Sequence, residues 1–199
     1  MFEIAEYIGI VAFAMSGFFI ATRNKLDFLG VLISVFLTAL GGGIMRDVIV
    51  DKTPYTFSNT MPALIIVSVM VLMVLFRFHK RPSIENKPFF ILSDSIGLVS
   101  FSITGAMIAV ESGVNLTGVL ALSFITAVGG GIIRDVIINE IPFVLKTGFY
   151  GTIALLIGVI IYLLENFALM NIWTLSLLFI SGIILRLVAY YNKWAIPMI

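Results

Sequence analysis

Long apolar stretches, separated by short polar breaks, run along nearly the whole chain. Seven of them are close to the roughly 20 residues that a helix needs to cross a bilayer. They lack the strict apolar–polar alternation of strands, and a segment in lipid must satisfy its backbone hydrogen bonds internally, so we predict helices. The predicted spans are Ile4–Thr22, Phe28–Val50, Pro62–Phe78, Phe89–Val110, Leu116–Ile138, Gly148–Leu164 and Ile172–Tyr191.

The composition leads to the same class of protein. The chain has 199 residues, of which 60% are hydrophobic and 12% are charged, whereas soluble domains carry roughly 25% charged residues. We therefore predict an all-α polytopic membrane protein with a single membrane domain, residues 1–199. The chain has no cysteine, so disulfides and thiolate metal sites are excluded. Its one histidine, His79, lies in a predicted loop, so we expect no enzyme and no cofactor, and the net charge of +1 gives no indication of nucleic-acid binding.

Lysine and arginine are distributed unequally between the two sides of the predicted bundle. One side has Arg23, Lys25, Arg77, Lys80, Arg81, Lys87, Lys146 and Lys193, and the loops of the other side have only Lys52. The positive-inside rule then predicts a plasma-membrane protein with its N-terminus outside and its C-terminus in the cytoplasm. We expect the basic loop residues Arg77, Lys80, Arg81 and Lys87 to orient the protein. The alternative is that they attract anionic lipid headgroups.

The first three spans and the next three are two copies of one unit. A shift of 88 residues aligns "GGGIMRD" at Gly41 with "GGGIIRD" at Gly129, together with several flanking glycines and phenylalanines. Repeat 1 covers about residues 1–78, a basic linker about 79–88, repeat 2 about 89–165, and the seventh helix about 171–191. An odd number of spans per unit makes the two repeats inverted, an architecture that places its site near the bilayer midplane. A duplication that serves only folding is the alternative.

Each repeat carries three consecutive glycines inside an apolar span: Gly41, Gly42 and Gly43, then Gly129, Gly130 and Gly131. Glycine costs a helix interior about 1 kcal/mol relative to alanine. Close helix packing through small residues is one explanation, but three adjacent residues point about 100° apart, so packing accounts for only one of them. We therefore predict a kink or local unwinding. Its freed carbonyls would line a wet cavity, where transient K⁺ or Na⁺ contacts are the only metal binding expected.

Charged residues follow both glycine triplets. Arg46 and Asp47 align with Arg134 and Asp135, and Glu6 aligns with Asp94. Neighbouring positions on a helix do not face each other, so we predict crossed pairs, Arg46 with Asp135 and Arg134 with Asp47, or equivalents through Glu6 and Asp94. The alternative places the arginines at the interface, where their charge reaches water.

The balance of four acids against two arginines favours a cation path, although the arginines would equally suit a substrate carboxylate. Four hydroxyls lie in the same predicted spans as these charges: Ser16, Thr38, Thr104 and Thr126. We expect them to bond to carbonyls of their own helices. Lining the path is the alternative role.

At these residues the chain resembles the trimeric intracellular cation (TRIC) channel family in its prokaryotic branch, which overlaps an uncharacterised membrane family with a "glycine transporter" domain. The resemblance covers the whole chain and lies in the seven spans, the two repeats and the paired "GGGIMRD" and "GGGIIRD". It implies a homotrimer with an hourglass-shaped, water-filled pore in each protomer. The glycine-rich second and fifth helices would form the middle of that pore, with potassium preferred over sodium. The Lys-Glu-Val motif of animal members does not occur here, so their lipid regulation is not carried over.

Three functions remain after the sequence is read. The first is a potassium-preferring cation channel with a pore inside each protomer. The second is a secondary transporter of a small zwitterion such as glycine, in which the arginines bind the carboxylate. The third is a membrane scaffold that transports nothing.

Overall fold

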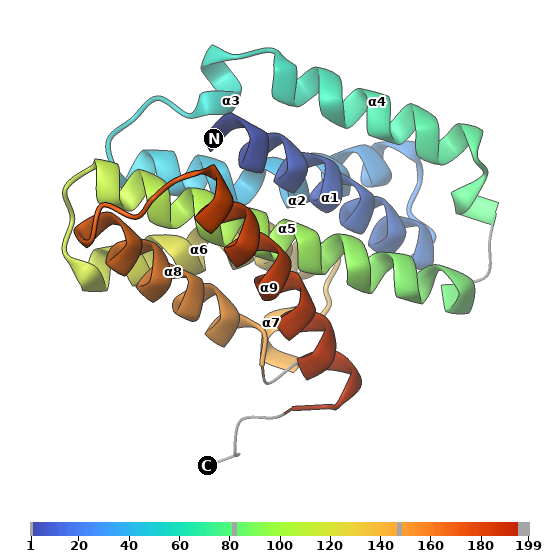
Figure 1. Ribbon diagram of the computed structural model, residues 1–199. Helices are drawn as coiled ribbons and strands as arrows, with labels where there is room; N and C mark the ends of the chain where they lie inside the picture. The colour runs from blue at the N-terminus through green and yellow to red at the C-terminus, as the bar shows by residue number, and fades with distance from the viewer. Residues whose placement is uncertain (1, 81–82, 147–148, 195–199) are drawn as a thin grey trace.

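The computed structural model describes residues 2–80, 83–146 and 149–194. Helices occupy most of these residues, and their order follows the predicted spans (Figure 1). They are α1 Phe2–Arg23, α2 Phe28–Ile49, α3 Tyr55–Ser58, α4 Met61–Leu75, the 3₁₀ turn η1 Phe78–Lys80, α5 Ser83–Glu111, α6 Leu116–Ile137, α7 Phe143–Lys146, α8 Gly151–Asn166 and α9 Ile172–Tyr191.

Among the described residues, five helices are long and apolar enough to cross a membrane: α1, α2, α5 from Lys87 onward, α6 and α9. The apolar helices α4 and α8 are shorter, with 15 and 16 residues. Helix α5 begins at Ser83 rather than at the predicted Phe89, with Pro88 inside it. Hydropathy marks only the part of a helix that lies in lipid, so the polar turns before that part were predicted as linker. Arg81 lies outside the described residues.

Four helices form the centre of the bundle (Figure 1). Helix α1 packs on α5, and α2 packs on α6. Each of these pairs joins equivalent helices of the two units. Within the units, α1 packs on α2 as α5 packs on α6. Helix α4 covers α1, α8 covers α5 and α6, and α9 lies against α5 and α8.

The contact between α1 and α5 uses matched glycines and phenylalanines. A Cβ on Gly97 would overlap the ring of Phe13, and a Cβ on Gly9 would lie 3.1 Å from the ring of Phe101. The two rings stack on each other with centroids 5.2 Å apart. Helices in lipid associate through close packing rather than through the hydrophobic effect, so small residues opposite large rings stabilise this crossing.

The equivalent helices α2 and α6 also begin in the same way. The side chain of Asp27 accepts a hydrogen bond from the backbone N–H of Gly30, and Asn115 does the same for Gly118. Each cap satisfies one of the backbone donors that a helix N-terminus leaves unpaired. The two helices thus begin with the same kind of cap at positions 88 residues apart.

Candidate functional site: a buried arginine network

Helices α2 and α6 run unbroken through both glycine triplets, so the predicted local unwinding is wrong. The glycines instead bring the two helices into close contact. A Cβ on Gly42 would overlap the carbonyl oxygen of Thr126, and a Cβ on Gly130 would overlap that of Thr38. The space that a side chain would need is filled by the opposite helix, which makes the bare glycine backbone a packing surface.

The third glycine of each triplet makes room for an arginine. A Cβ on Gly43 would lie 3.2 Å from Glu6 Oε1 and 3.7 Å from Arg46 Nη2. A Cβ on Gly131 would lie 3.8 Å from Arg134 Nη2. Each triplet therefore combines a helix crossing with a buried guanidinium one turn further along.

Arg46 is fully buried and is held by two carboxylates of its own repeat. Its Nη1 and Nη2 donate to Glu6 Oε2 and Oε1 at 2.8 and 3.2 Å, and its Nε donates to Asp47 Oδ1 at 2.7 Å. The guanidinium also lies 5.2 Å from the ring centroid of Phe2, in cation–π range. Bidentate pairing with a carboxylate is the geometry in which a buried arginine is best compensated.

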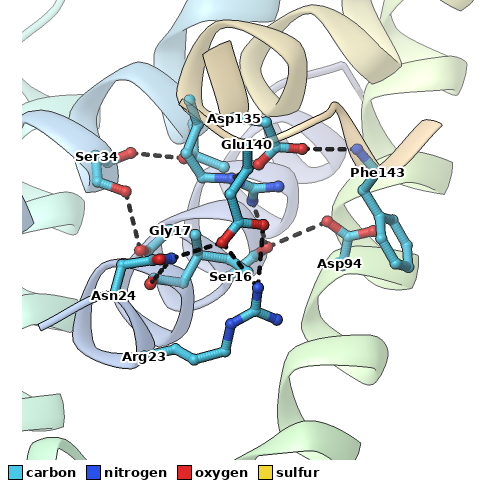
Figure 2. A network of polar contacts seen from close by, with 12 residues as sticks. Ser16, Gly17, Arg23, Asn24, Ser34, Asp94, Asp135, Glu140 and Phe143 are labelled. Atoms are coloured by element: carbon cyan, nitrogen blue, oxygen red, sulfur yellow. Dashed lines mark hydrogen bonds and ion pairs between the residues drawn. The ribbon is translucent and has the colours of Figure 1, made fainter. Parts of the chain in front are cut away.

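The aspartate after each arginine has a second partner. Asp47 Oδ2 accepts the backbone N–H of Tyr55 at 2.8 Å, and Asp135 Oδ2 accepts that of Phe143 at 2.7 Å (Figure 2). Tyr55 and Phe143 begin the short helices α3 and α7. The Arg-Asp pair therefore connects each long helix to the short helix that follows it.

Arg134 repeats part of this arrangement. Its Nε donates to Asp135 Oδ1 at 2.8 Å, and its Nη1 donates to Ser16 Oγ at 3.0 Å. Ser16 in turn donates to Asp94 Oδ1 at 3.1 Å (Figure 2). The guanidinium lies 5.9 Å from the ring centroid of Phe90, which is the equivalent of Phe2 in the second repeat.

The structure corrects the predicted crossed ion pairs. Arg46 and Arg134 each bind the aspartate next to them, and Arg46 also binds Glu6 of its own repeat. Side-chain flexibility explains the error, because a long arginine side chain can curl back onto its neighbour although the two Cβ atoms point apart. The interfacial alternative also fails, since the exposed fractions of Arg46 and Arg134 are 0% and 1%.

One hydroxyl links each of these two buried arginines to the opposite repeat. Thr104 accepts a hydrogen bond from Arg46 Nη1 at 3.2 Å, and Ser16 accepts one from Arg134. Each hydroxyl thus binds the arginine of the other repeat. The expected bonds to carbonyls of the same helix are confirmed for Thr38 and Thr126, which donate to Ser34 and Leu122. Thr104 also donates to Phe101 of its own helix, whereas Ser16 donates to Asp94 instead.

A cavity of about 640 Å³ leads to the second arginine. Its lining includes Arg134 and Asp135, which are only 1% and 3% exposed and therefore lie at its inner end. Five cationic and two acidic side chains line it: Arg23, Lys25, Lys87, Arg134 and Lys146, with Asp135 and Glu140. Most of these cations belong to the basic side predicted from the sequence. One of them, Lys87, was predicted in the basic loop and lies in the first turns of α5. Arg77 and Lys80 are exposed, and neither lines this cavity.

Glu140 joins the two repeats across the cavity wall. Its carboxylate accepts hydrogen bonds from Arg23 Nη2 at 2.8 Å and from Asn24 Nδ2 at 3.0 Å (Figure 2). Lys146 Nζ lies 3.9 Å away. Partial burial alone would raise the pKa of Glu140, but the hydrogen bonds from Asn24 and Arg23 and the charges of Arg23 and Lys146 outweigh it, so the pKa is lowered.

Sequence reasoning missed Arg186 on α9. Its side chain is only 2% exposed, and its guanidinium lies 4.7, 5.7 and 5.6 Å from the ring centroids of Tyr150, Phe143 and Tyr190. The available signal was a single arginine within an apolar span, which almost always faces the protein interior. The repeat alignment concealed it, because the seventh helix has no counterpart in either repeat.

A family model described as glycine transporter matches residues 3–79 and 91–166. The UPF0126 membrane protein YvgT of Bacillus subtilis is 35% identical over 98% of this chain and 95% of its own length. A solved TRIC cation channel is 35% identical with a TM-score of 0.85, covering 100% of this chain and 97% of that one. The chain belongs to the TRIC family. A prokaryotic TRIC channel crystallised in 0.5 M KCl is similar too, with 32% identity, a TM-score of 0.88 and 96% of each chain covered.

This membership confirms the resemblance drawn from the two glycine motifs, including the overlap with the "glycine transporter" family. Its secondary structure is helical throughout the described ranges, and it is a membrane protein, as its named relatives are. Its solved TRIC neighbours are channels rather than enzymes.

Proposed function

We propose that this TRIC protein is a monovalent cation channel that prefers potassium, with the pore inside each protomer. The observation that carries the proposal is the cavity that ends at Arg134 and Asp135, beside the crossing of α2 and α6. The similarity of the whole chain to TRIC cation channels supports the same function. A pathway would continue from this cavity past Arg46, the arginine of the first repeat, to the opposite face.

The proposed architecture has seven spans, with two inverted three-helix repeats and α9 as the seventh helix. Helices α4 and α8, at 1.5 Å per residue, are about 22 and 24 Å long, which is shorter than the roughly 30 Å hydrocarbon core. Local thinning of the bilayer would accommodate this mismatch. The cavity supports the arrangement, because the residues after α1, before α5, after α6 and near the end of α9 gather around it.

Selectivity for cations would arise at the inner end of the pathway rather than at the basic mouth of the cavity. Cationic side chains outnumber carboxylates along the cavity, so the mouth does not concentrate cations. At Arg46 the balance is reversed, because Glu6 and Asp47 both bind the single guanidinium. A permeating cation would meet one excess negative charge there, in surroundings of low dielectric constant where charge acts strongly.

The alternative of a zwitterion transporter is not favoured. A substrate carboxylate would need a guanidinium with free donors, but Arg46 already donates to Glu6, Asp47 and Thr104. A substrate that displaced Glu6 and Asp47 from Arg46 would leave two buried carboxylates without their cation, which costs several kcal/mol.

We further propose that the protein forms a homotrimer in the plasma membrane, with the cavity open to the cytoplasm and the N-terminus outside. A solved relative from Rhodobacter sphaeroides, 27% identical with a TM-score of 0.85, is a trimeric intracellular cation channel. The basic side chains around the cavity support the orientation through the positive-inside rule. Their contacts with lipid headgroups would be a secondary effect.

The test is planar-bilayer recording of the purified protein under a KCl gradient, first with potassium and then with sodium. We expect unitary currents that reverse near the potassium equilibrium potential and become smaller in sodium. Asp135→Asn should reduce the potassium current, and Asp51→Asn, at an exposed position beyond α2, is the matched control. Absence of current from wild-type protein, together with saturable glycine uptake into liposomes, would overturn the proposal. Absence of both would leave the scaffold as the answer.

A further inference from the structure

The two arginine sites differ at one acid. Glu6 reaches Arg46 with both carboxylate oxygens. The equivalent acid in the second repeat, Asp94, has a side chain that is shorter by one methylene. Within the described part of the chain it forms no ion pair with Arg134, and Ser16 bridges the two instead.

Asp94 is therefore a buried carboxylate without the bidentate cation that Glu6 has. It is 2% exposed, Ser16 donates to its Oδ1, and the side chain of Tyr150 lies against it. A buried charge that lacks a partner is strongly unfavourable, so a nearby cation is required. Two cations act electrostatically on Asp94, Arg134 and Arg186.

Arg186, in turn, is a buried cation with a donor that lacks a partner among the residues that the structure describes. Its Nε finds no hydrogen-bond acceptor in the described ranges. The faces of three aromatic rings surround its guanidinium, and one of them, Tyr150, lies beside Asp94. Cation–π contacts compensate a buried guanidinium only in part, so the carboxylate of Asp94 supplies the rest.

Arg186 also lies directly behind the wall of the cavity. Two of the three rings that surround it, Phe143 and Tyr190, line that cavity. Counted with Arg186, the second site has two guanidiniums and two carboxylates, so it is neutral. The first site has one guanidinium and two carboxylates.

We propose that Arg186 of the seventh helix is the counter-charge of Asp94, and that it thereby sets how much the second charge site contributes to the cation selectivity of the pathway. The proposal rests on the channel function proposed above. Helix α9 would then have an electrostatic role in addition to packing on α5 and α8, because its Arg186 neutralises the second of two otherwise equivalent charge sites. Arg186 acts through Asp94 and through the potential in the cavity, and it is therefore a positioning residue.

The experiment measures the ratio of potassium to chloride permeability, from reversal potentials in a KCl gradient, for wild type and four variants. Arg186→Gln removes a positive charge and should raise the ratio by at least about threefold. Asp94→Asn should lower it by a similar factor, and the double variant should return close to the wild-type ratio. Arg186→Lys keeps the charge and should shift the ratio less than Arg186→Gln. Lys193→Gln, which removes an exposed charge two residues beyond the end of α9, is the control and should leave the ratio unchanged.

A purely structural role for Arg186 would move both single variants in the same direction, or neither, and either result overturns the proposal. If Arg186→Gln does not fold but the double variant does, charge compensation is supported by folding itself. If neither folds, Asp94→Asn decides alone, since an unchanged or higher ratio contradicts the proposal and a lower ratio supports it. A wild-type protein without current would instead refute the channel function, so the two failures are distinguishable.

Discussion

Alanine substitutions in the glycine triplets separate helix packing from helix breaking. At Gly42 and Gly130 an added methyl group would overlap a backbone carbonyl of the opposite helix, which cannot rotate away as a side chain could. At Gly131 the nearest atom is Arg134 Nη2 at 3.8 Å, an ordinary contact. Gly131→Ala is thus a control with the same chemical change, in the same triplet as Gly130.

The expected changes in the free energy of unfolding have opposite signs at the two kinds of site. Overpacking a tight site costs about 1 to 3 kcal/mol, whereas alanine gains up to about 1 kcal/mol over glycine in a helix interior. For a chain of this length, 1 kcal/mol corresponds to a shift of about 2 to 4 °C in Tm. Gly42→Ala and Gly130→Ala should therefore lower the apparent Tm by about 2 to 12 °C, while Gly131→Ala should leave it unchanged or raise it slightly.

The assay is thermal unfolding of purified protein in one detergent, followed by the loss of the monodisperse peak in size-exclusion chromatography. A bilayer recording of the folded variants adds the functional readout. If Gly42→Ala and Gly131→Ala have the same Tm, the close contact of α2 with α6 is not what the glycines serve. Normal current after alanine replaces all six glycines would remove any role for them in the pore.

Two further predictions concern ion pairs. Glu6→Gln leaves Arg46 without its bidentate partner and should destabilise the protein by about 3 to 5 kcal/mol in the same unfolding assay. The control is Glu3→Gln, at an exposed position on the same helix, which should change the Tm little. Equal Tm values for the two variants would contradict the bidentate pair. The lowered pKa of Glu140 means that its contribution to stability is complete above the ordinary value of 4.5 and is lost as the pH falls through the lowered pKa. The Tm of Glu140→Gln should therefore fall less than that of wild type between pH 6 and the acid limit of the assay, and parallel curves would refute the role of the Arg23–Glu140 pair.

Hydropathy was sufficient to locate the long apolar helices, but it did not predict the short helices α3 and α7. Phe28–Val50 was predicted and Phe28–Ile49 was found, because lipid imposes helices on apolar runs of this length. The repeat also identified the acids and arginines that the structure brings together. The partner of each arginine could not be predicted from the sequence. A flexible side chain with several donors can bind its neighbour, another residue of its own repeat or a residue of the other repeat, and helix rotation decides which. Arg186 was missed for a related reason, because a residue outside the repeat has no aligned partner to draw attention to it.

The triplets also show why the argument for unwinding failed. Three adjacent helical residues do point about 100° apart, but the inference assumed that only one direction was crowded. In α2 the directions from Gly41, Gly42 and Gly43 meet Ile133 with Gly130, the carbonyl of Thr126, and the Glu6–Arg46 pair, respectively. A side chain at these positions would meet a side chain and a glycine backbone, a backbone carbonyl, and a buried ion pair, respectively. A run of glycines in a membrane helix therefore indicates crowding on several sides as readily as a broken helix, and here the buried arginine one turn later is part of that crowding.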